Sequence, residues 1–296
     1  MKSKIDFTSR FLITIVLLGL FSCSADEEDL IGDYSAPQEL PSNLTAGTPL
    51  TDRILQLYDD YGIIVYTDTI VGDRMYRDLV SEEGLQISDR KPADSTAAIL
   101  YVDMIEEEFI NVLPEGREDL IFRNFYLFKN DLVSGTSAWS SYEYISHVWY
   151  NSNADLTVGG IDNAIMDSLH YKQTFFYGLS KVLRSDAVNN ENYYRPFVDY
   201  KTDAAVYYWQ VNSLEAAYER GFLTANQNLI KSDQQDFDLF AAWGATTDPE
   251  EMQALMDQYP MIRYKYELVA QMFRQEGIPL EEINEKWQAS SYNPNN

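Results

Sequence analysis

Apolar side chains recur every three or four positions along two long stretches, residues 94–112 and 164–184. This spacing places them on one face of a helix and predicts two long α-helices. Residues 63–67 and 122–133 are instead rich in β-branched and aromatic side chains, which predicts strands. Beyond residue 184 the pattern is largely helical, with helices expected in residues 214–218, 232–243, 260–273 and 279–287. The pattern thus predicts an α+β half followed by a helical half.

Capping residues mark where some of these helices begin and end. Thr51 and Asp52 are expected to cap a first helix, which Gly62 then ends. Residues 247–251 place a threonine and an aspartate just before Pro249, and this order is typical of a helix start. The chain shows no internal repeat.

The first 22 residues have the pattern of a signal peptide. Three basic residues precede the apolar run of residues 11–21, which is too short to span a bilayer stably. Cys23 follows directly and is the one cysteine of the chain. A small residue before such a cysteine resembles the lipobox of bacterial lipoproteins, which implies that Cys23 carries acyl chains, palmitate among them, and anchors the protein to membrane lipid. An ordinary signal peptide beside a free thiol is the alternative.

Four consecutive acids, residues 26–29, stand just behind this cysteine. Acids repel anionic headgroups, so the tract is expected to hold the protein away from the membrane surface. It also resembles the acidic export signal of surface lipoproteins in Bacteroidota, which implies an outer-membrane protein facing the cell exterior. A solvated linker is the plainer interpretation. Residues 23–48 as a whole are polar and proline-bearing, which predicts a flexible tether.

Charge and cysteine content exclude some classes of function. The chain has 22 basic and 47 acidic residues, a formal charge of −25. Residues 1–22 hold three of the bases and one of the acids, so 19 bases face 46 acids after cleavage and the charge becomes −27. Nucleic-acid binding needs the opposite sign, and we expect none. Without a second cysteine no internal disulfide can form.

Three short segments carry a resemblance to a known family. They are residues 48–65, the run Phe125–Phe128, and residues 259–280 with their Gly-Ile-Pro-Leu ending. They resemble the zinc-binding metallopeptidase-like lipoprotein family of Bacteroidota and together span most of residues 48–287. The resemblance implies a zincin-like fold, with a small mixed sheet and long helices in residues 49–184 and a mostly helical C-terminal lobe in residues 185–296. It also implies a setting beside outer-membrane uptake proteins.

The zinc motif of that family is degenerate in this chain. The motif H-E-x-x-H places two histidines on one helix face to hold zinc, with a glutamate that activates water. The matching positions hold Tyr177, Gly178 and Lys181, and Gln235 stands where the family has a further ligand. The chain has only two histidines, 23 positions apart, so no H-E-x-x-H exists at any alignment. We therefore expect no zinc, no cofactor and no catalytic residue of the zincin type.

Other side chains are expected to occupy the space in which the family holds its metal ion. Residues four apart on a helix lie side by side, so the phenol of Tyr177 and the ammonium of Lys181 are expected to fill it. Asp236 and Asp238 are candidate pocket acids that Lys181 would neutralise. On this interpretation the lysine rescues the structure and performs no catalysis.

Other chemistry has weaker support. His147 and His170 are each expected to be structural or surface histidines, and Glu106–Glu108 is expected to be a solvated helix face. No G-x-S-x-G or phosphate-loop pattern occurs.

The sequence thus favours a surface-exposed, non-catalytic lipoprotein that serves as an accessory or binding subunit of an outer-membrane complex, of the SusCD nutrient-importer type, with a peptide or glycan as its ligand. The alternatives are a hydrolase or peptidase that uses other residues, and a scaffold without a ligand.

Overall fold

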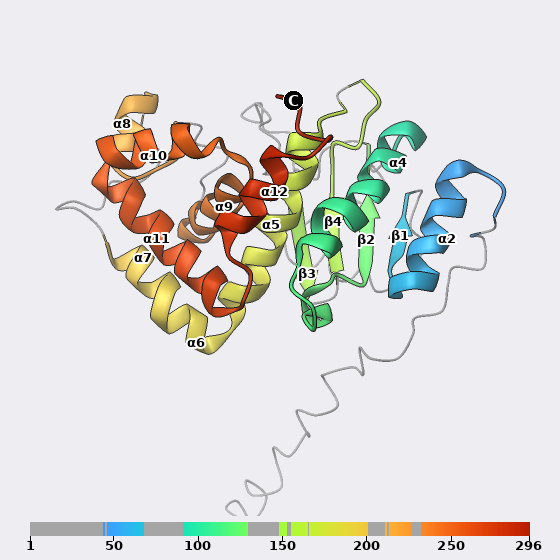
Figure 1. Ribbon diagram of the computed structural model, residues 1–296, viewed down its shortest axis with the longest axis horizontal. Helices are drawn as coiled ribbons and strands as arrows, with labels where there is room; N and C mark the ends of the chain where they lie inside the picture. The colour runs from blue at the N-terminus through green and yellow to red at the C-terminus, as the bar shows by residue number, and fades with distance from the viewer. Residues whose placement is uncertain are drawn as a thin grey trace, which may run out of the picture. The chain divides into compact units, whose positions relative to one another are not determined.

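The computed structural model describes residues 44, 46–67, 91–129, 148–152, 155–164, 166–200, 211, 213–225 and 232–296 (Figure 1). The expected signal peptide, the acidic tract, Cys23 and His147 lie outside these residues, as does the end of the predicted strand 122–133. Within the described ranges no helix is long and apolar enough to cross a membrane.

A small mixed sheet forms the framework of the first half. Its strands are β1 (Ile64–Tyr66), β2 (Asn124–Leu127), β3 (Val148–Ser152) and β4 (Asp155–Val158), in the order β1-β2-β4-β3. β1, β2 and β4 run parallel, and β3 pairs with β4 in the antiparallel direction. The expected mixed sheet is thus confirmed. The strand predicted from residue 122 begins two residues later, because Phe122 packs into the core ahead of β2.

The first helix, α2 (Pro49–Tyr61), begins earlier than predicted. Thr48 caps it, and Thr51 is the third helical residue, whose hydroxyl in turn accepts a bond from the Thr48 backbone N–H at 3.0 Å. This reciprocal capping box, with proline at the first position, outcompetes the expected cap at Thr51 and Asp52. Gly62 ends the helix as predicted, at a φ of 68° that favours glycine.

The predicted helix 94–112 is continuous but changes its geometry along its length. It comprises α4 (Ser95–Met104), a π-helical turn (Ile105–Phe109) and a 3-10 turn (Ile110–Val112). A π turn inserts an extra residue and rotates those that follow. Glu108 on this turn is 6% exposed, so the expectation that Glu106–Glu108 forms a solvated face is wrong for that residue.

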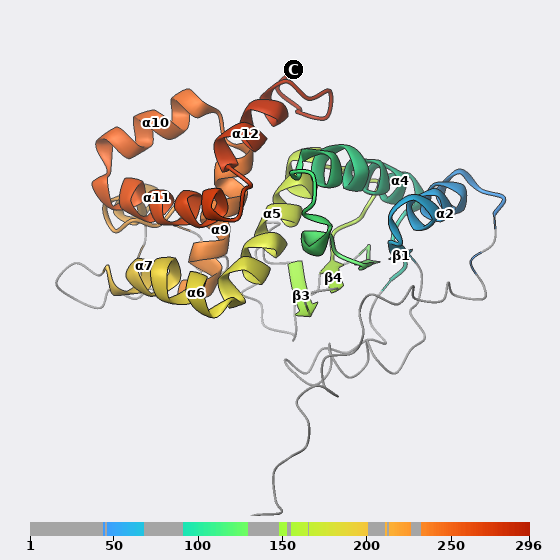
Figure 2. The ribbon, with the colours of Figure 1, turned by 60° about the horizontal axis from the view of Figure 1, so that its bottom comes forward.

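Helix α5 (Ser168–Ser185) lies between the sheet and the C-terminal helices (Figures 1 and 2). Asp167 caps it through a bond from the N–H of His170, so it begins four residues later than predicted. Toward the sheet, Phe175 of α5 packs on Phe125 of β2 and on Phe109 of the π turn. An aromatic core therefore fixes the helix against β2.

The helical C-terminal half is confirmed, and α9 is its centre. Its helices are α6 (Ala187–Asn189), a π turn (Asn190–Tyr194), α7 (Arg195–Asp199), α8 (Leu214–Glu219), α9 (Asp233–Thr246), α10 (Pro249–Gln258), α11 (Pro260–Gln275) and α12 (Leu280–Gln288). α9 packs against α5, α11 and α12. The start predicted at residues 247–251 is confirmed, because the Asp248 carboxylate accepts bonds from two backbone N–H groups of α10, at 2.9 and 3.0 Å.

Candidate functional site

Tyr177 and Lys181, the positions at which the family resemblance implies zinc ligands, lie on α5 and are buried and half-buried, respectively. Tyr177 is 3% exposed, and burial raises the pKa of its phenol far above the ordinary value, with the nearby charge of Asp238 adding to the rise. Lys181 is half-buried, and its Nζ lies 5.0 Å from the centre of the Tyr177 ring. The phenol and the ammonium therefore stack as expected for residues four apart on one helix.

Gly178 faces the sheet at very short range. A Cβ at this position would lie 2.7 Å from Cδ1 of Leu156 on β4 and 3.2 Å from Cζ of Phe122. The first distance is shorter than side-chain contacts allow, so even alanine requires Leu156 to move. A glutamate at this position, where the family motif has its general base, would require Leu156 and Phe122 to rearrange.

Asp238 lies at the junction of α9 with α5. Its carboxylate accepts two bonds from Arg184, at 3.1 Å from Nε and 2.8 Å from Nη2, and a third from the hydroxyl of Ser180 at 2.8 Å. A guanidinium that binds both carboxylate oxygens fixes geometry as well as charge. Asp238, Arg184 and Ser180 thus hold the two helices together beside Tyr177.

Asp236 lies at a different junction, against α11. Lys265 donates to its Oδ2 at 2.5 Å, and the same ammonium lies over the rings of Phe197, Phe222 and Phe240 at 4.7, 4.6 and 5.9 Å. Oδ1 of Asp236 is buried and makes no hydrogen bond to the residues that the structure describes. Burial raises the pKa of Asp236 to about 6, although the Lys265 charge opposes the rise.

The two candidate pocket acids therefore do not share one pocket. Residues two apart on a helix point about 200° apart, since each step turns by about 100°. Asp238 faces α5 and Asp236 faces α11. Gln235, the position of the family's further ligand, lies in the first turn of α9, where its N–H donates to the Ser232 hydroxyl at 3.2 Å. Of the two acids, only Asp238 lies beside Tyr177.

A third buried ion pair was not predicted from the sequence. Lys172 of α5 has no exposed surface and donates to the Glu108 carboxylate at 2.8 Å and to the Glu108 carbonyl at 2.6 Å. Burial lowers the pKa of Lys172 to about 8, against the opposing effect of Glu108. The rings of Phe176 and Trp287 lie 5.1 and 5.7 Å from its ammonium. A single lysine in a helix does not indicate from the sequence that it is buried in an ion pair. The run of acids that contains Glu108 instead indicated a solvent-exposed helix face.

Metal-binding capacity is low in the parts of the chain that the structure describes. They contain no group of three or more histidines, cysteines, aspartates or glutamates arranged to hold a metal ion. His170 is buried beside Tyr171, with ring centres 5.7 Å apart, which agrees with the structural role expected for it.

The comparison with solved structures gives one informative similarity. A crystal structure of a candidate zinc-binding metallo-peptidase from Bacteroides caccae superposes with a TM-score of 0.53, covering 84% of this chain and 98% of that protein at 13% identity. The two proteins share a fold. No family model and no curated protein matches the sequence. The expected α+β architecture, with a small mixed sheet followed by a helical half, is thus confirmed, while the low identity says nothing about shared activity.

Proposed function

We propose that this chain is a lipid-anchored, non-catalytic protein that uses a metallopeptidase-like fold as an accessory or binding subunit of an outer-membrane complex. The packing of Gly178 against Leu156 carries the non-catalytic part of the proposal. A zincin needs a carboxylate at that helix position to activate the metal-bound water, whereas this position carries no side chain and packs closely against Leu156 and Phe122. Tyr177 and Lys181 close the adjacent positions with an aromatic ring and a cation.

The location rests on the N-terminal sequence. A lipobox-like Cys23 followed by four acids favours attachment to the outer membrane with the folded part outside. A SusCD-type nutrient importer is the partner complex that the family resemblance suggests. The negative charge of the chain agrees with a soluble domain presented in water above an anionic surface.

Metal analysis tests the non-catalytic part. The purified full chain is expected to contain far less than one zinc per molecule after incubation with zinc and gel filtration. It is also expected to show no peptidase activity that a chelator abolishes. One tightly held equivalent of zinc together with chelator-sensitive proteolysis would contradict the non-catalytic proposal and identify the protein as a hydrolase.

A pull-down tests the partner. Native membranes solubilised in mild detergent are expected to yield an outer-membrane importer with the tagged protein, identified by mass spectrometry. An untagged strain and an unrelated tagged outer-membrane lipoprotein serve as controls. Recovery of the protein alone, or the same proteins in both controls, contradicts the accessory role.

A further inference from the structure

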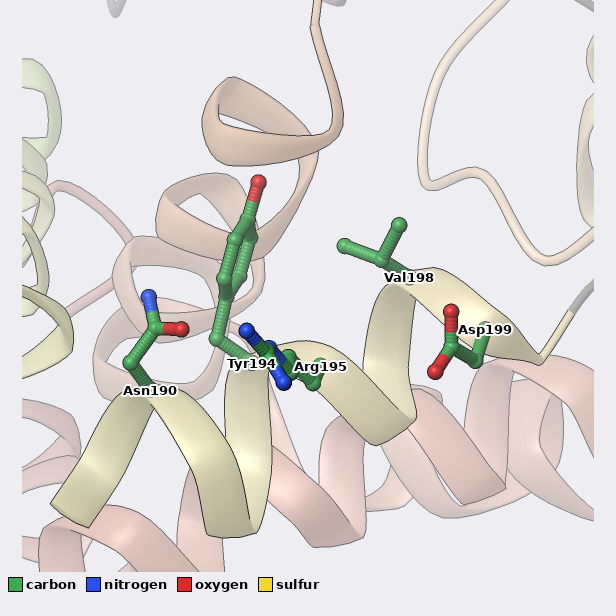
Figure 3. A pocket seen from close by; sticks show the side chains of 5 residues that line it. All are labelled: Asn190, Tyr194, Arg195, Val198 and Asp199. Carbon is green, nitrogen blue, oxygen red and sulfur yellow. The ribbon is translucent and has the colours of Figure 1, made fainter. Parts of the chain in front are cut away.

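An open pocket of about 380 Å³ lies along the outer side of α7 and the π turn before it (Figure 3). Its lining consists of Asn190, Tyr194, Arg195, Val198 and Asp199. The volume falls within the range of small-molecule sites.

The central side chain of the pocket is held rigidly from behind. Arg184 lies 5.4 Å from the centre of the Tyr194 ring, and Phe237 of α9 meets the ring edge-on at 5.6 Å. Arg184 is itself fixed by its two bonds to Asp238. Figure 3 shows the ring projecting from the ribbon between Asn190 and Val198. The ring is therefore a preorganised platform, which lowers the entropy cost of stacking a ligand on it.

The polar groups around this ring have unused hydrogen-bonding capacity. Toward the described residues, neither the Asn190 amide, the Tyr194 hydroxyl nor the Asp199 carboxylate makes a side-chain hydrogen bond. Among the described residues Arg195 pairs with Glu191 alone, at 2.8 Å, and both side chains are more than half exposed. Such a pair contributes little and exchanges readily with a ligand. Donors and acceptors thus lie side by side next to an aromatic face.

The charges of the lining favour a ligand without net charge. Arg195 disfavours a cation and Asp199 disfavours an anion, since they lie four residues apart on one helix face. A ligand that uses the whole lining must donate and accept hydrogen bonds at neighbouring atoms and offer a flat C–H face to Tyr194. Sugar rings combine these properties, with adjacent hydroxyls that both donate and accept.

We propose that this pocket is a binding site for a neutral oligosaccharide. The proposal rests on the binding role proposed above, but it concerns a surface separate from the degenerate zinc positions. Tyr194 stacks against one sugar ring, Asn190 and Asp199 bind hydroxyls, and Arg195 leaves Glu191 to bind another oxygen.

Glycan binding by the full chain in detergent tests the proposal. The probes are neutral hexasaccharides of α-linked glucose, β-linked glucose, mannose and xylose, measured by titration calorimetry and by a wider array of neutral glycans. At least one is expected to bind, and Asp199→Ala and Asn190→Ala are each expected to weaken it about tenfold. Tyr194→Phe keeps the ring and is expected to cost about three- to tenfold, while Tyr194→Ala abolishes binding.

Tyr193→Phe is the matched control, because that phenol lies next in the chain but bonds to Gln275 outside the pocket. It is expected to leave glycan binding unchanged. Thermal unfolding of each variant separates lost binding from lost folding, and the exposed Asp199 variant is expected to fold normally. The proposal is overturned if no neutral glycan binds, if Asp199→Ala and Tyr194→Phe bind as the wild type does, or if neutral peptides bind at the pocket and glycans do not. Co-purification with an importer is measured independently. A failure of glycan binding would therefore overturn the pocket proposal without deciding whether the protein is an importer subunit.

Discussion

The ammonium of Lys265 and the carboxylate of Asp236 form a buried ion pair, 2.5 Å apart, that joins α11 to α9. Each ion has lost nearly all contact with water, and aromatic rings replace the solvent around the lysine. Removing one partner of such a pair leaves the other charge buried without compensation. The two junctions of α9, this one and Arg184–Asp238, position the helix on both of its sides.

Replacing Lys265 by methionine is expected to destabilise the fold by about 3–5 kcal/mol, because Asp236 then remains buried without its cation. The double variant Lys265→Met, Asp236→Asn is expected to recover most of this loss. Urea unfolding followed by circular dichroism measures both. Arg263→Met on the same helix is the control, since its pair with Asp257 is exposed and is expected to contribute less than about 1 kcal/mol. Equal losses for Lys265→Met and Arg263→Met would contradict the prediction.

The raised pKa of Asp236 makes a specific contribution to pH-dependent stability. Its folded-state pKa of about 6 lies above the ordinary value of 3.8. Between these values the folded state holds a proton that the unfolded state has released, so raising the pH favours unfolding. Relative to Asp236→Asn, the wild type is expected to lose stability as the pH rises from about 4 to about 6 and to change no further above that. Parallel curves for the two proteins would show that Asp236 does not titrate in this window.

Gly178→Ala is expected to destabilise the protein by about 1–3 kcal/mol, because the new methyl group overlaps Leu156. The gain in helix propensity from glycine to alanine offsets part of this cost. Leu156→Ala in the same chain opens space, so the alanine at 178 is expected to cost less there than in the wild type. A double-mutant cycle from urea unfolding gives the coupling. Strict additivity would mean that the two positions do not touch.

Lys181→Met and Lys181→Glu distinguish packing from charge at the degenerate site. Methionine keeps an apolar stem over the Tyr177 ring, and we expect a loss of less than about 1 kcal/mol. Glutamate brings a second acid beside Ser180, whose hydroxyl binds Asp238, and we expect a loss of about 1–3 kcal/mol. Thermal unfolding measures both, and a glutamate variant as stable as the methionine variant would argue against an electrostatic role for Lys181.

If Cys23 carries the proposed acyl chains, Cys23→Ala is expected to release the protein from membranes and to stop incorporation of labelled fatty acid, because the apolar anchor is then lost. Cys23→Ser serves as a second variant with a similar side-chain volume. Membrane fractionation followed by immunoblotting measures the release. Continued membrane association without label would mean that a protein partner holds it there.

Replacing Asp26, Glu27, Glu28 and Asp29 by alanine is expected to leave the lipid in place but to remove the protein from the cell surface. Protease added to whole cells measures the exposure, with lysed cells as the control for intrinsic sensitivity. The corresponding asparagine and glutamine variant separates charge from side-chain size. Undiminished digestion on whole cells would contradict an export role for the acidic tract.

Helical periodicity predicted the existence of most elements, because amphipathic faces are set by local spacing. The errors lie at helix boundaries and irregular turns, which the periodic pattern does not register. Thr48, rather than Thr51 and Asp52, caps α2, since a reciprocal pair of hydroxyl bonds is stronger than either cap alone. The π turn at Ile105–Phe109 has no periodic signal, and it is this turn that carries Glu108 inward.

The candidate site was only partly predictable from the sequence. The spacing of Tyr177 and Lys181 was enough to predict their stacking, because it depends on one helix alone. The partners of Asp236 and Asp238 depend on which helices pack against α9. Because each residue turns an α-helix by about 100°, the two carboxylates point toward different neighbouring helices. Arg184 and Lys265, the cations that bind them, carried no distinguishing pattern.

The pair of Glu108 with Lys172 also bears on the order in which the chain assembles. Ser290 donates to the same carboxylate from 182 positions further along, and Trp287 covers the lysine. Helices form within microseconds, but contacts between segments so distant in the chain form late. The interior of the first lobe is therefore finished only once the end of the second has arrived. A nascent chain therefore keeps the surroundings of Lys172 incomplete until the residues near Ser290 have been added.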